Sequence, residues 1–266
     1  MNISSVKLVY FSPTKTSKQI VEGIAKGIQD GPIEHLDLTP RQAKSQAFIE
    51  LHEELAIIGA PVYGGRLPIE AVSRLKRLKA NNTPAVVVVV YGNREYEDAL
   101  LELRDLALET GFKPVAGGAF IGEHSFSTEE TPIANGRPDT EDLKKAMEFG
   151  KKIQETMGKI SRPMDTSSLQ VPGNYPYRER SQRSEATPIT KEEYCIKCGK
   201  CADACPTAAI TINSLITTEQ DTCILCCACV KSCPTNARVM DLPRIKNVSE
   251  WLYTNFSKRK EPETYI

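Results

Sequence analysis

Nine cysteines crowded into one short segment constrain the fold of this chain more than any other feature of its sequence. All nine lie between Cys195 and Cys233, and the first 194 residues contain none. Eight of them form two copies of the pattern C-x2-C-x2-C-x3-C-P, the first beginning at Cys195 and the second at Cys223. The beginning of the chain has no basic segment followed by a long apolar stretch, so we expect no secretory signal. The crowding therefore indicates metal ligation rather than a disulfide framework.

The spacing within each run is typical of bacterial iron–sulfur proteins, in which three cysteines bind one cluster and the fourth binds the other. Three thiolates on a tight loop can reach three irons of one cubane, while the fourth enters a short helix that points elsewhere. We therefore predict two [4Fe–4S] clusters, one bound by Cys195, Cys198, Cys201 and Cys233, and the other by Cys205, Cys223, Cys226 and Cys229. Structural zinc sites also use four thiolates and are the alternative. Two full copies of the run, each followed by proline, argue against zinc.

The segments that follow the two cysteine runs, AAITI and ARVMDL, are predicted to be short strands. With these strands, residues 190–242 resemble the two-cluster bacterial ferredoxins. No acid, base or nucleophile motif surrounds the cysteines, and adjacent clusters are suited to passing single electrons. Cys227 is left over beside the predicted ligand Cys226, and we expect it to be a small buried apolar side chain. A redox-reactive thiol is the alternative.

The first 158 residues follow a different pattern, in which apolar strands alternate with amphipathic helices. Predicted strands cover residues 6–11, 32–38, 54–60, 84–91 and 113–122, and predicted helices cover residues 16–30, 68–79, 96–110 and 140–158. Because parallel strands need helical crossovers, this alternation predicts an α/β fold with a doubly wound, five-stranded parallel sheet. In such sheets, ligands bind beyond the carboxyl ends of the strands.

The loop after the first predicted strand, FSPTKTS, gathers hydroxyl side chains at the start of a predicted helix. These are Ser12, Thr14, Thr16 and Ser17. Backbone amides at a helix N-terminus favour an anion, and the hydroxyls add donors, so the loop predicts a phosphate site. An ordinary helix cap is the alternative. Lys15 stands where such loops usually carry glycine.

This loop resembles the phosphate loop of flavodoxins, and the loops APVYGGRLP and YGNREYEDA extend the resemblance over residues 5–158. It implies the strand order 2-1-3-4-5 and a bound FMN. At the phosphate it implies Ser12, Thr14, Lys15, Thr16 and Ser17. Around the flavin it implies Pro61, Val62, Tyr63, Gly64, Gly65 and Arg66 in the second loop, and Tyr91, Gly92, Asn93, Arg94 and Tyr96 in the third.

The resemblance also implies roles for single residues. Tyr63 and Tyr96 would flank the flavin ring, and Gly64 would permit a peptide flip toward flavin N5. Backbone groups of Gly92 and Asn93 would meet the polar edge of the ring.

Charged groups are expected near the same flavin edge. A cation from Arg66 or Arg94 near flavin N1 would stabilise the reduced ring, the alternative being solvated loop charges. His124 lies on the same rim, where it would donate a hydrogen bond or cap its own loop.

The rest of the chain divides by composition. We predict a flavodoxin-like domain at residues 1–158, a connector rich in proline and serine at 159–189, the ferredoxin domain at 190–242, and a C-terminal helix and tail at 243–266. The connector is expected to be either a flexible tether or a strap packed on a domain. The last helix is expected to begin at Ser249 and to pack through Trp251 and Phe256, with KRKEPE as a solvated tail.

The charge balance excludes several classes of partner. Acidic and basic residues number 34 each, so no strong field attracts nucleic acid or anionic lipid. The longest apolar run, AVVVVVY, is too short to span a bilayer. We therefore expect a cytoplasmic protein without nucleic-acid or membrane partners, and the oligomeric state stays open.

The order of the domains resembles the flavodoxin–ferredoxin fusions of anaerobic bacteria and archaea, called the EFR1 family of ferredoxins. The resemblance implies an electron-transfer protein that moves electrons between FMN and two [4Fe–4S] clusters and on to a separate redox partner protein. The alternative is a flavin-dependent reductase, an enzyme that acts on a small substrate or a nicotinamide at an exposed FMN. No G-x-G-x-x-G pattern for a second nucleotide is present.

Overall fold

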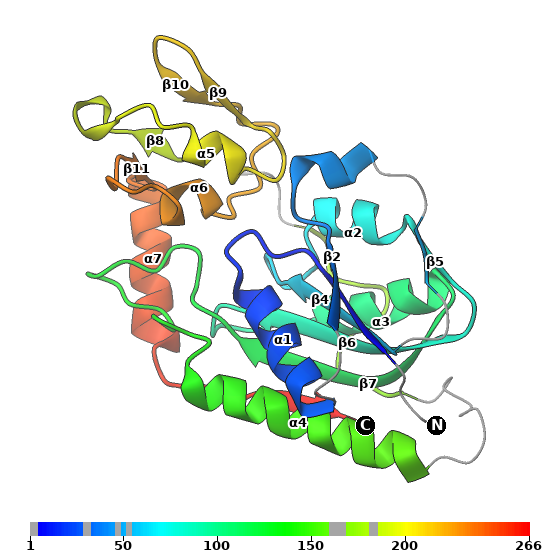
Figure 1. Cartoon of the computed structure of the whole chain (residues 1–266). Helices are drawn as coiled ribbons and strands as arrows, with labels where there is room; N and C mark the ends of the chain where they lie inside the picture. The colour runs from blue at the N-terminus through cyan, green and yellow to red at the C-terminus, as the bar shows by residue number, and fades with distance from the viewer. Residues whose placement is uncertain (1–4, 29–32, 46–48, 52–54, 160–168, 181–185) are drawn as a thin grey trace.

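A computed structural model of the chain describes residues 5–28, 33–45, 49–51, 55–159, 169–180 and 186–266. Its main sheet contains β1 (Val6–Tyr10), β2 (Ile33–Asp37), β4 (Leu55–Pro61), β6 (Thr83–Tyr91), β7 (Phe112–Ile121) and β12 (Glu263–Tyr265). The strands lie in the order β12-β7-β6-β4-β1-β2 (Figure 1). In chain order, the first five strands of this sheet are parallel and follow the predicted order 2-1-3-4-5, which is that of flavodoxin-like sheets. The predicted fold class is therefore confirmed.

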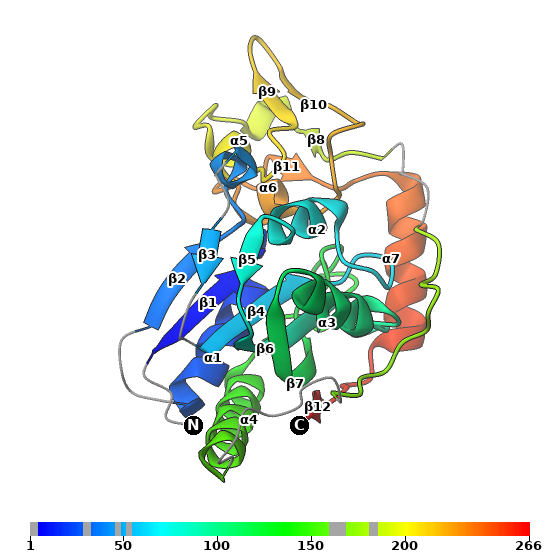
Figure 2. The ribbon, with the colours of Figure 1, turned by 90° about the vertical axis from the view of Figure 1, so that its right-hand side faces the viewer.

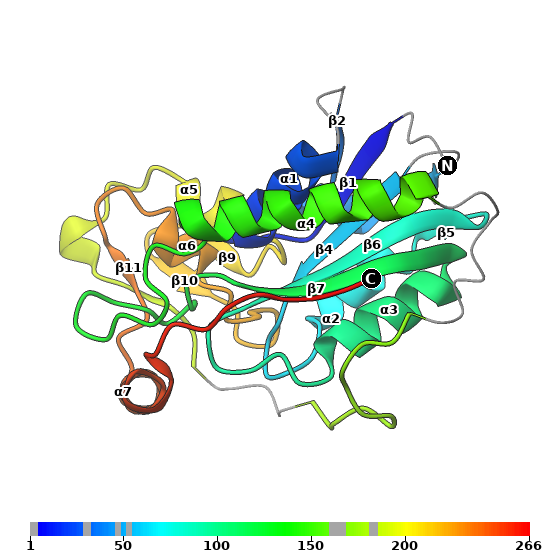
Figure 3. The same cartoon turned by 90° about the horizontal axis from the view of Figure 1, so that it is seen from below.

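Helices cover both faces of the sheet, as a doubly wound fold requires. α1 (Thr16–Ile28) and α4 (Thr140–Lys159) lie on one face, and α2 (Ile69–Leu75) and α3 (Ala99–Glu109) lie on the other (Figure 3). α1 and α4 approach so closely that a Cβ on Gly27 would lie 2.0 Å from the Met147 carbonyl oxygen. Glycine at this position lets the two backbones meet.

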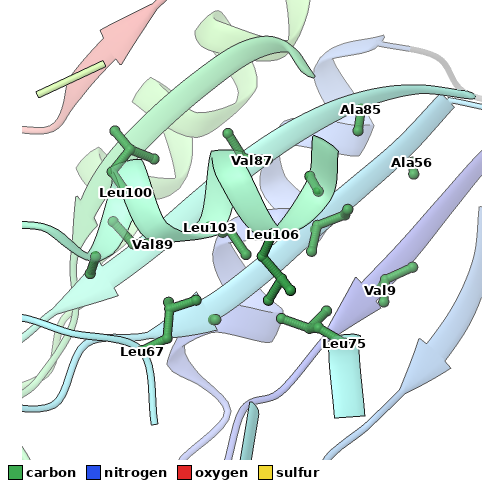
Figure 4. Close-up of a cluster of buried hydrophobic side chains, with 14 of the residues drawn as sticks. Val9, Ala56, Leu67, Leu75, Ala85, Val87, Val89, Leu100, Leu103 and Leu106 are labelled. Carbon is green, nitrogen blue, oxygen red and sulfur yellow. The ribbon is translucent and has the colours of Figure 1, made fainter. Parts of the chain in front are cut away.

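Two apolar cores fill the space between the sheet and these helices. Val87 and Val89 face the α3 side with Leu103 and Leu106 (Figure 4), whereas Val86 and Val88 face the α1 and α4 side. The uninterrupted valine run of β6 follows from this arrangement, because both faces of the central strand are buried. Each such side chain stabilises the fold by about 1.5–3 kcal/mol through burial.

Some elements differ from the sequence-based expectation. α2 ends at Leu75, and the chain continues into β5 (Leu78–Ala80), which pairs in parallel with β3 (Ile49–Leu51). A 3-10 helix, η1 (Arg41–Ser45), precedes β3. Arg74, in the last turn of α2, is buried.

The cysteine-rich domain consists of two short, similar halves. The first contains β8 (Ile189–Thr190), the 3-10 helix η3 (Glu192–Tyr194), α5 (Lys200–Asp203) and β9 (Ile210–Ile212). The second contains β10 (Ile216–Thr218), α6 (Ala228–Lys231) and β11 (Arg238–Val239). β9 pairs with β10, and β8 pairs with β11. The predicted strands after both cysteine runs are present as β9 and β11, which are shorter than the predicted segments AAITI and ARVMDL.

The connector crosses α3 as a strap over its described part, residues 169–180. Asp98 accepts hydrogen bonds from the amides of Asn174 (2.8 Å) and Arg178 (2.7 Å). The Tyr177 hydroxyl donates to Asp105 at 2.6 Å. The strap alternative therefore holds for this segment, while the remainder of the connector, residues 160–168 and 181–185, lies outside the described residues.

The C-terminal segment returns to the main sheet instead of ending as a solvated tail. α7 (Pro243–Phe256) begins at Pro243, earlier than the expected start at Ser249, because proline suits the first turn of a helix. It runs along one side of the molecule (Figure 2), and β12 then pairs antiparallel with β7. Arg259 forms an ion pair with Asp139 at 2.6 Å. Within the described residues, no helix has the length and apolar character needed to cross a bilayer.

Candidate functional site

A cavity of about 480 Å³ lies at the carboxyl edge of the parallel sheet, between the two domains. One side of it is formed by the segments that follow β1, β4, β6 and β7. The second cysteine run and α7 form the other side. The sheet therefore places its crevice where doubly wound folds bind ligands, and the cysteine-rich domain closes over it.

The hydroxyl loop contributes to this cavity through Thr14 and Thr16. Ser12 instead caps α1, because its Oγ accepts a hydrogen bond of 3.0 Å from the Lys18 amide. The first amides of a helix have no intrahelical partner and favour an anion. Ser17 Oγ is buried and, within the described residues, has no hydrogen-bond partner. Ser17 does not line the cavity, but the hydroxyls of Thr14 and Thr16 and the first amides of α1 are donors suited to a phosphate group, so the loop fits the predicted ligand.

Lys15 occupies the glycine-type position of this loop with a left-handed backbone, at φ 68°. Its side chain is exposed and does not line the cavity. The left-handed conformation costs a non-glycine residue about 1–2 kcal/mol. The loop therefore keeps its turn despite the substitution, and the residue contributes backbone geometry.

Four aromatic side chains, Tyr63, Tyr91, Phe126 and Trp251, line the cavity. Burial raises the pKa of Tyr63 well above its usual range, and the thiols of Cys226 and Cys227 act in the same direction. Tyr63 shares the lining of the cavity with Cys223 and Leu225 of the second cysteine run. Flat, mainly apolar walls of this kind suit a planar ring system.

His124 lines the same cavity and packs against Gly92. A Cβ at position 92 would lie 2.3 Å from the imidazole, so only glycine permits this contact. His124 Nδ1 accepts a hydrogen bond of 3.0 Å from the Phe126 amide, which assigns the proton of the neutral ring to Nε2. Burial, together with the nearby charges of Arg94 and Lys231, lowers the pKa of His124 to about 4. At neutral pH His124 thus caps its own loop and retains one N–H donor.

The structure brings nine of the predicted flavin-site residues to the lining of the cavity. They are Thr14, Thr16, Pro61, Val62, Tyr63, Gly64, Tyr91, Gly92 and Arg94. Gly64 has a positive φ of 61°, a conformation that glycine adopts without strain. The other predicted residues do not line the cavity: Ser12, Lys15, Ser17, Gly65, Arg66, Asn93 and Tyr96.

Tyr96 is placed differently from the expected stacking position. Its side chain is buried, and its hydroxyl donates to Glu263 at 2.9 Å and lies 3.0 Å from the Tyr265 hydroxyl. Tyr96 therefore anchors β12 at the sheet edge. Trp251 of α7 and Tyr91 line the cavity instead.

Arg66 and Asn93 also hold the fold together rather than facing the cavity. Arg66 Nε donates to Glu102 at 2.8 Å, and Arg66 Nη1 donates to the Arg178 carbonyl at 2.6 Å. Asn93 is buried, and its Nδ2 donates to the Lys258 carbonyl at 2.9 Å. Of the two arginines expected near the flavin edge, Arg66 therefore does not line the cavity, whereas Arg94 does. The arginines that do line the cavity are Arg94, Arg180 and Arg244.

A second, smaller cavity of about 20 Å³ lies inside the cysteine-rich domain. Its lining includes Cys205, Cys223, Cys226 and Cys229, the predicted ligands of one cluster. Burial raises the pKa of the Cys226 thiol, and the three neighbouring thiols add to the effect. Cys205 Sγ also accepts a hydrogen bond of 3.3 Å from the Ala209 amide. Among the described residues, no three His, Cys, Asp or Glu side chains are placed to hold a single metal ion.

The other predicted ligand set, Cys195, Cys198, Cys201 and Cys233, lies nearer to solvent. Cys198 is exposed, whereas Cys226, its counterpart in the second run, is buried. Burial alone would raise the pKa of Cys233, but hydrogen bonds from the amides of Arg238 and Thr235 lower it below its usual value. A thiol with a lowered pKa ionises readily, which suits it as a metal ligand.

The two cavities share part of their lining. Cys223 and Ile224 line both the large cavity and the small one. Buried Arg74 links the domains, since its Nη2 donates to the Pro206 carbonyl at 2.6 Å. Lys231 forms a further ion pair with Glu123. The cysteine-rich domain is therefore docked directly on the cavity.

The residues of α7 that line the large cavity were missed from the sequence. Ile245, Val248 and Leu252 face it, beside Trp251. Their spacing of three and four residues was a usable signal for one helical face. The helix expected from the sequence begins only at Ser249, so it does not include Ile245 and Val248.

The comparisons with known proteins agree with the cysteine pattern. Residues 188–211 and 216–239 each match the family described as "4Fe-4S binding domain". The prediction of 4Fe–4S clusters is therefore confirmed, and the zinc alternative is not supported. No curated protein matches the chain.

Solved structures are similar to the N-terminal domain. Oxidised flavodoxin 2 from Bacillus cereus is 16% identical with a TM-score of 0.41, over 57% of this chain and 99% of that chain. A flavodoxin from the domain Archaea is 13% identical with a TM-score of 0.37, over 58% and 99%. Rubredoxin oxygen:oxidoreductase from the anaerobe Desulfovibrio gigas is 12% identical with a TM-score of 0.41, over 58% and 36%. The fold assignment rests on the strand order and not on these similarities.

Proposed function

We propose that this chain is an electron-transfer protein with FMN in the large cavity and two [4Fe–4S] clusters in the cysteine-rich domain. The observation that carries the proposal is the shared lining of the two cavities by Cys223 and Ile224. A group in the large cavity would lie beside a ligand of the cluster held by Cys205, Cys223, Cys226 and Cys229. FMN exchanges one or two electrons, whereas each cluster exchanges one.

The residues present fit FMN at both of its ends. Thr14 and Thr16, with the amides that open α1, would hold the phosphate. Tyr63, Tyr91 and Trp251 would enclose the ring. A ring held there would have the second cysteine run as its neighbour, because Cys223 and Ile224 line the same cavity.

The exposed first cysteine run is the proposed exit toward a redox partner protein. Cys198 is exposed, and Tyr194 and Ile196 beside it are 57% and 65% exposed. Large exposed apolar side chains next to a ligand loop suit a transient protein contact. The proposed route therefore runs from the large cavity to the buried cluster, the exposed cluster and then the partner.

The test is anaerobic reconstitution of the full chain with iron, sulfide and FMN. We expect eight irons, one flavin, and absorption from both groups. Thr16→Val should weaken FMN binding about tenfold, because a hydrogen bond to a charged group is lost. Thr156→Val on α4, outside the cavity, is the control. A protein that carries clusters but takes up no FMN would disprove the flavin half of the proposal.

A flavin-dependent reductase is the second candidate. The donor on His124 and the guanidinium of Arg94, both at the cavity, are the observations that favour it. Steady oxidation of NADH or NADPH by the isolated holoprotein, lost in His124→Ala, would establish this candidate over the carrier.

A further inference from the structure

Arg238, at the start of β11, is a large, fully buried side chain with only 2% exposure. Its Nη1 donates to Thr190 Oγ1 at 2.8 Å and its Nη2 donates to Thr218 Oγ1 at 2.6 Å. The same Nη2 lies 3.9 Å from Cys229 Sγ. The guanidinium therefore sits between the two halves of the cysteine-rich domain, beside a predicted cluster ligand.

The charge of Arg238 has no carboxylate partner within the described residues, and its Nε has no hydrogen-bond partner there. The hydroxyls that it contacts are neutral. Burying a cation without an opposite charge is costly. A cluster with its four thiolates is anionic, so it provides the missing opposite charge.

A comparison of the two halves of the repeat shows that only the second half has a buried arginine at this position. Ile210 in the first half and Arg238 in the second half occupy equivalent positions of the repeat. Each is the first residue of its strand, Ile210 of β9 and Arg238 of β11. Ile210 is also buried, at 8% exposure. Thr190 and Thr218 are likewise equivalent positions of the repeat, so the guanidinium contacts the same position in both halves. The two halves thus share their framework and differ here by one buried positive charge.

We propose that Arg238 raises the reduction potential of the cluster held by Cys205, Cys223, Cys226 and Cys229 above that of the other cluster. The inference rests on the proposed function, because it requires both clusters. Reduction adds one negative charge to a cluster, and a nearby buried cation stabilises that charge more than the oxidised form. In the transfer that it favours, the flavin loses one electron and the cluster gains one, and no bond forms or breaks.

The test is a redox titration of the anaerobic holoprotein followed by electron paramagnetic resonance. Arg238→Ile gives the second half the side chain that the first half has at the equivalent position, Ile210. We expect one of the two one-electron steps to become at least tenfold less favourable, which is about 59 mV, with a smaller change in the other step. Arg238→Lys retains the charge and should change that step less than threefold. Ile210→Val, the matched control, should leave both steps unchanged.

Iron and sulfide content separate the possible failures. Wild-type protein without clusters would contradict the proposed function itself. Fully loaded Arg238→Ile with unshifted steps would overturn only the role of Arg238. If Arg238→Ile does not load, Arg238→Gln is titrated in its place. Loss of clusters from both neutral variants would make Arg238 an assembly residue and would also overturn the proposal.

Discussion

The two halves of the cysteine-rich domain have similar backbone conformations but lie in different surroundings. Both halves place left-handed residues at the same repeat positions: Lys197 and Leu225, Gly199 and Cys227, and Ala208 and Asn236. The first half carries an exposed ligand, whereas the second half is packed on the large cavity. In the proposed electron path, the two copies of the metal-binding loop would hold different positions, because their neighbours differ although their ligands are the same.

Removal of one ligand from each half tests the proposed order of the clusters and carries the largest expected effect. Cys226→Ala and Cys198→Ala should each lower the iron content by about half, because each removes a ligand of one cluster. Only Cys226→Ala should also abolish rapid transfer from photoreduced flavin to the remaining cluster, measured by stopped-flow absorption. Equal transfer rates in the two variants would contradict the proposed order.

Thiol reactivity distinguishes the buried copy from the open one. Cys227 is 1% exposed, and burial raises the pKa of its thiol well above the usual range. In the holoprotein, iodoacetamide should modify it at least about tenfold more slowly than a cysteine introduced by Gly199→Cys. Position 199 is the matched control, since a Cβ there would meet open space. Comparable rates, measured by mass spectrometry, would support the reactive-thiol alternative.

The contact of the second half with the cavity also predicts a pH dependence. Burial lowers the pKa of His124 to about 4, with help from Arg94 and from Lys231 of the second half. The pKa of His124 in the folded protein is below its unfolded value of about 6.5, so the folded state favours the neutral imidazole. The contribution of neutral His124 to the free energy of unfolding is therefore fully present above pH 6.5 and is lost as the pH falls toward 4. The free energy of unfolding should be about 1–2 kcal/mol lower at pH 5 than at pH 7, followed by Trp251 fluorescence.

Two variants check the source of this pH dependence. His124→Gln should abolish it, and an unchanged slope in that variant would refute the assignment to His124. Lys231→Gln should reduce the loss, because the pKa of His124 rises when the neighbouring charge is removed. Asp203→Asn is the matched control, since Asp203 is the exposed counterpart of Lys231 in the first half.

Backbone strain at the shared left-handed positions gives a comparison whose smaller member is the smallest effect expected. Gly199 has φ 81° and Cys227 has φ 56°. Gly199→Ala should destabilise the holoprotein by about 1–2 kcal/mol, because only glycine adopts this conformation freely. Cys227→Ala keeps the strain and removes only a sulfur, so it should cost no more than about 1 kcal/mol. Anaerobic denaturant titration measures both, and a neutral Gly199→Ala would show that the first half tolerates a side chain there.

The sequence by itself determined the elements whose signals are local. The cysteine spacing predicted the iron–sulfur domain, and the alternation of strands and helices predicted the parallel sheet. The order of its strands was implied by the flavodoxin resemblance of the loops. These predictions succeed because ligand spacing and apolar periodicity are properties of neighbouring residues. The hydroxyl loop likewise marked one end of the cavity through Thr14 and Thr16.

The tertiary structure alone decided which side chains of those loops meet. Tyr96 and Arg66 stand beside flavin-type motifs, yet β12 engages one and the connector strap engages the other. Trp251 lines the cavity from α7, far along the chain from these loops. Arg238 occupies an apolar position of a repeat and becomes a buried charge beside Cys229. Such contacts depend on how distant segments pack, because burial and charge pairing are settled only once the whole chain has folded.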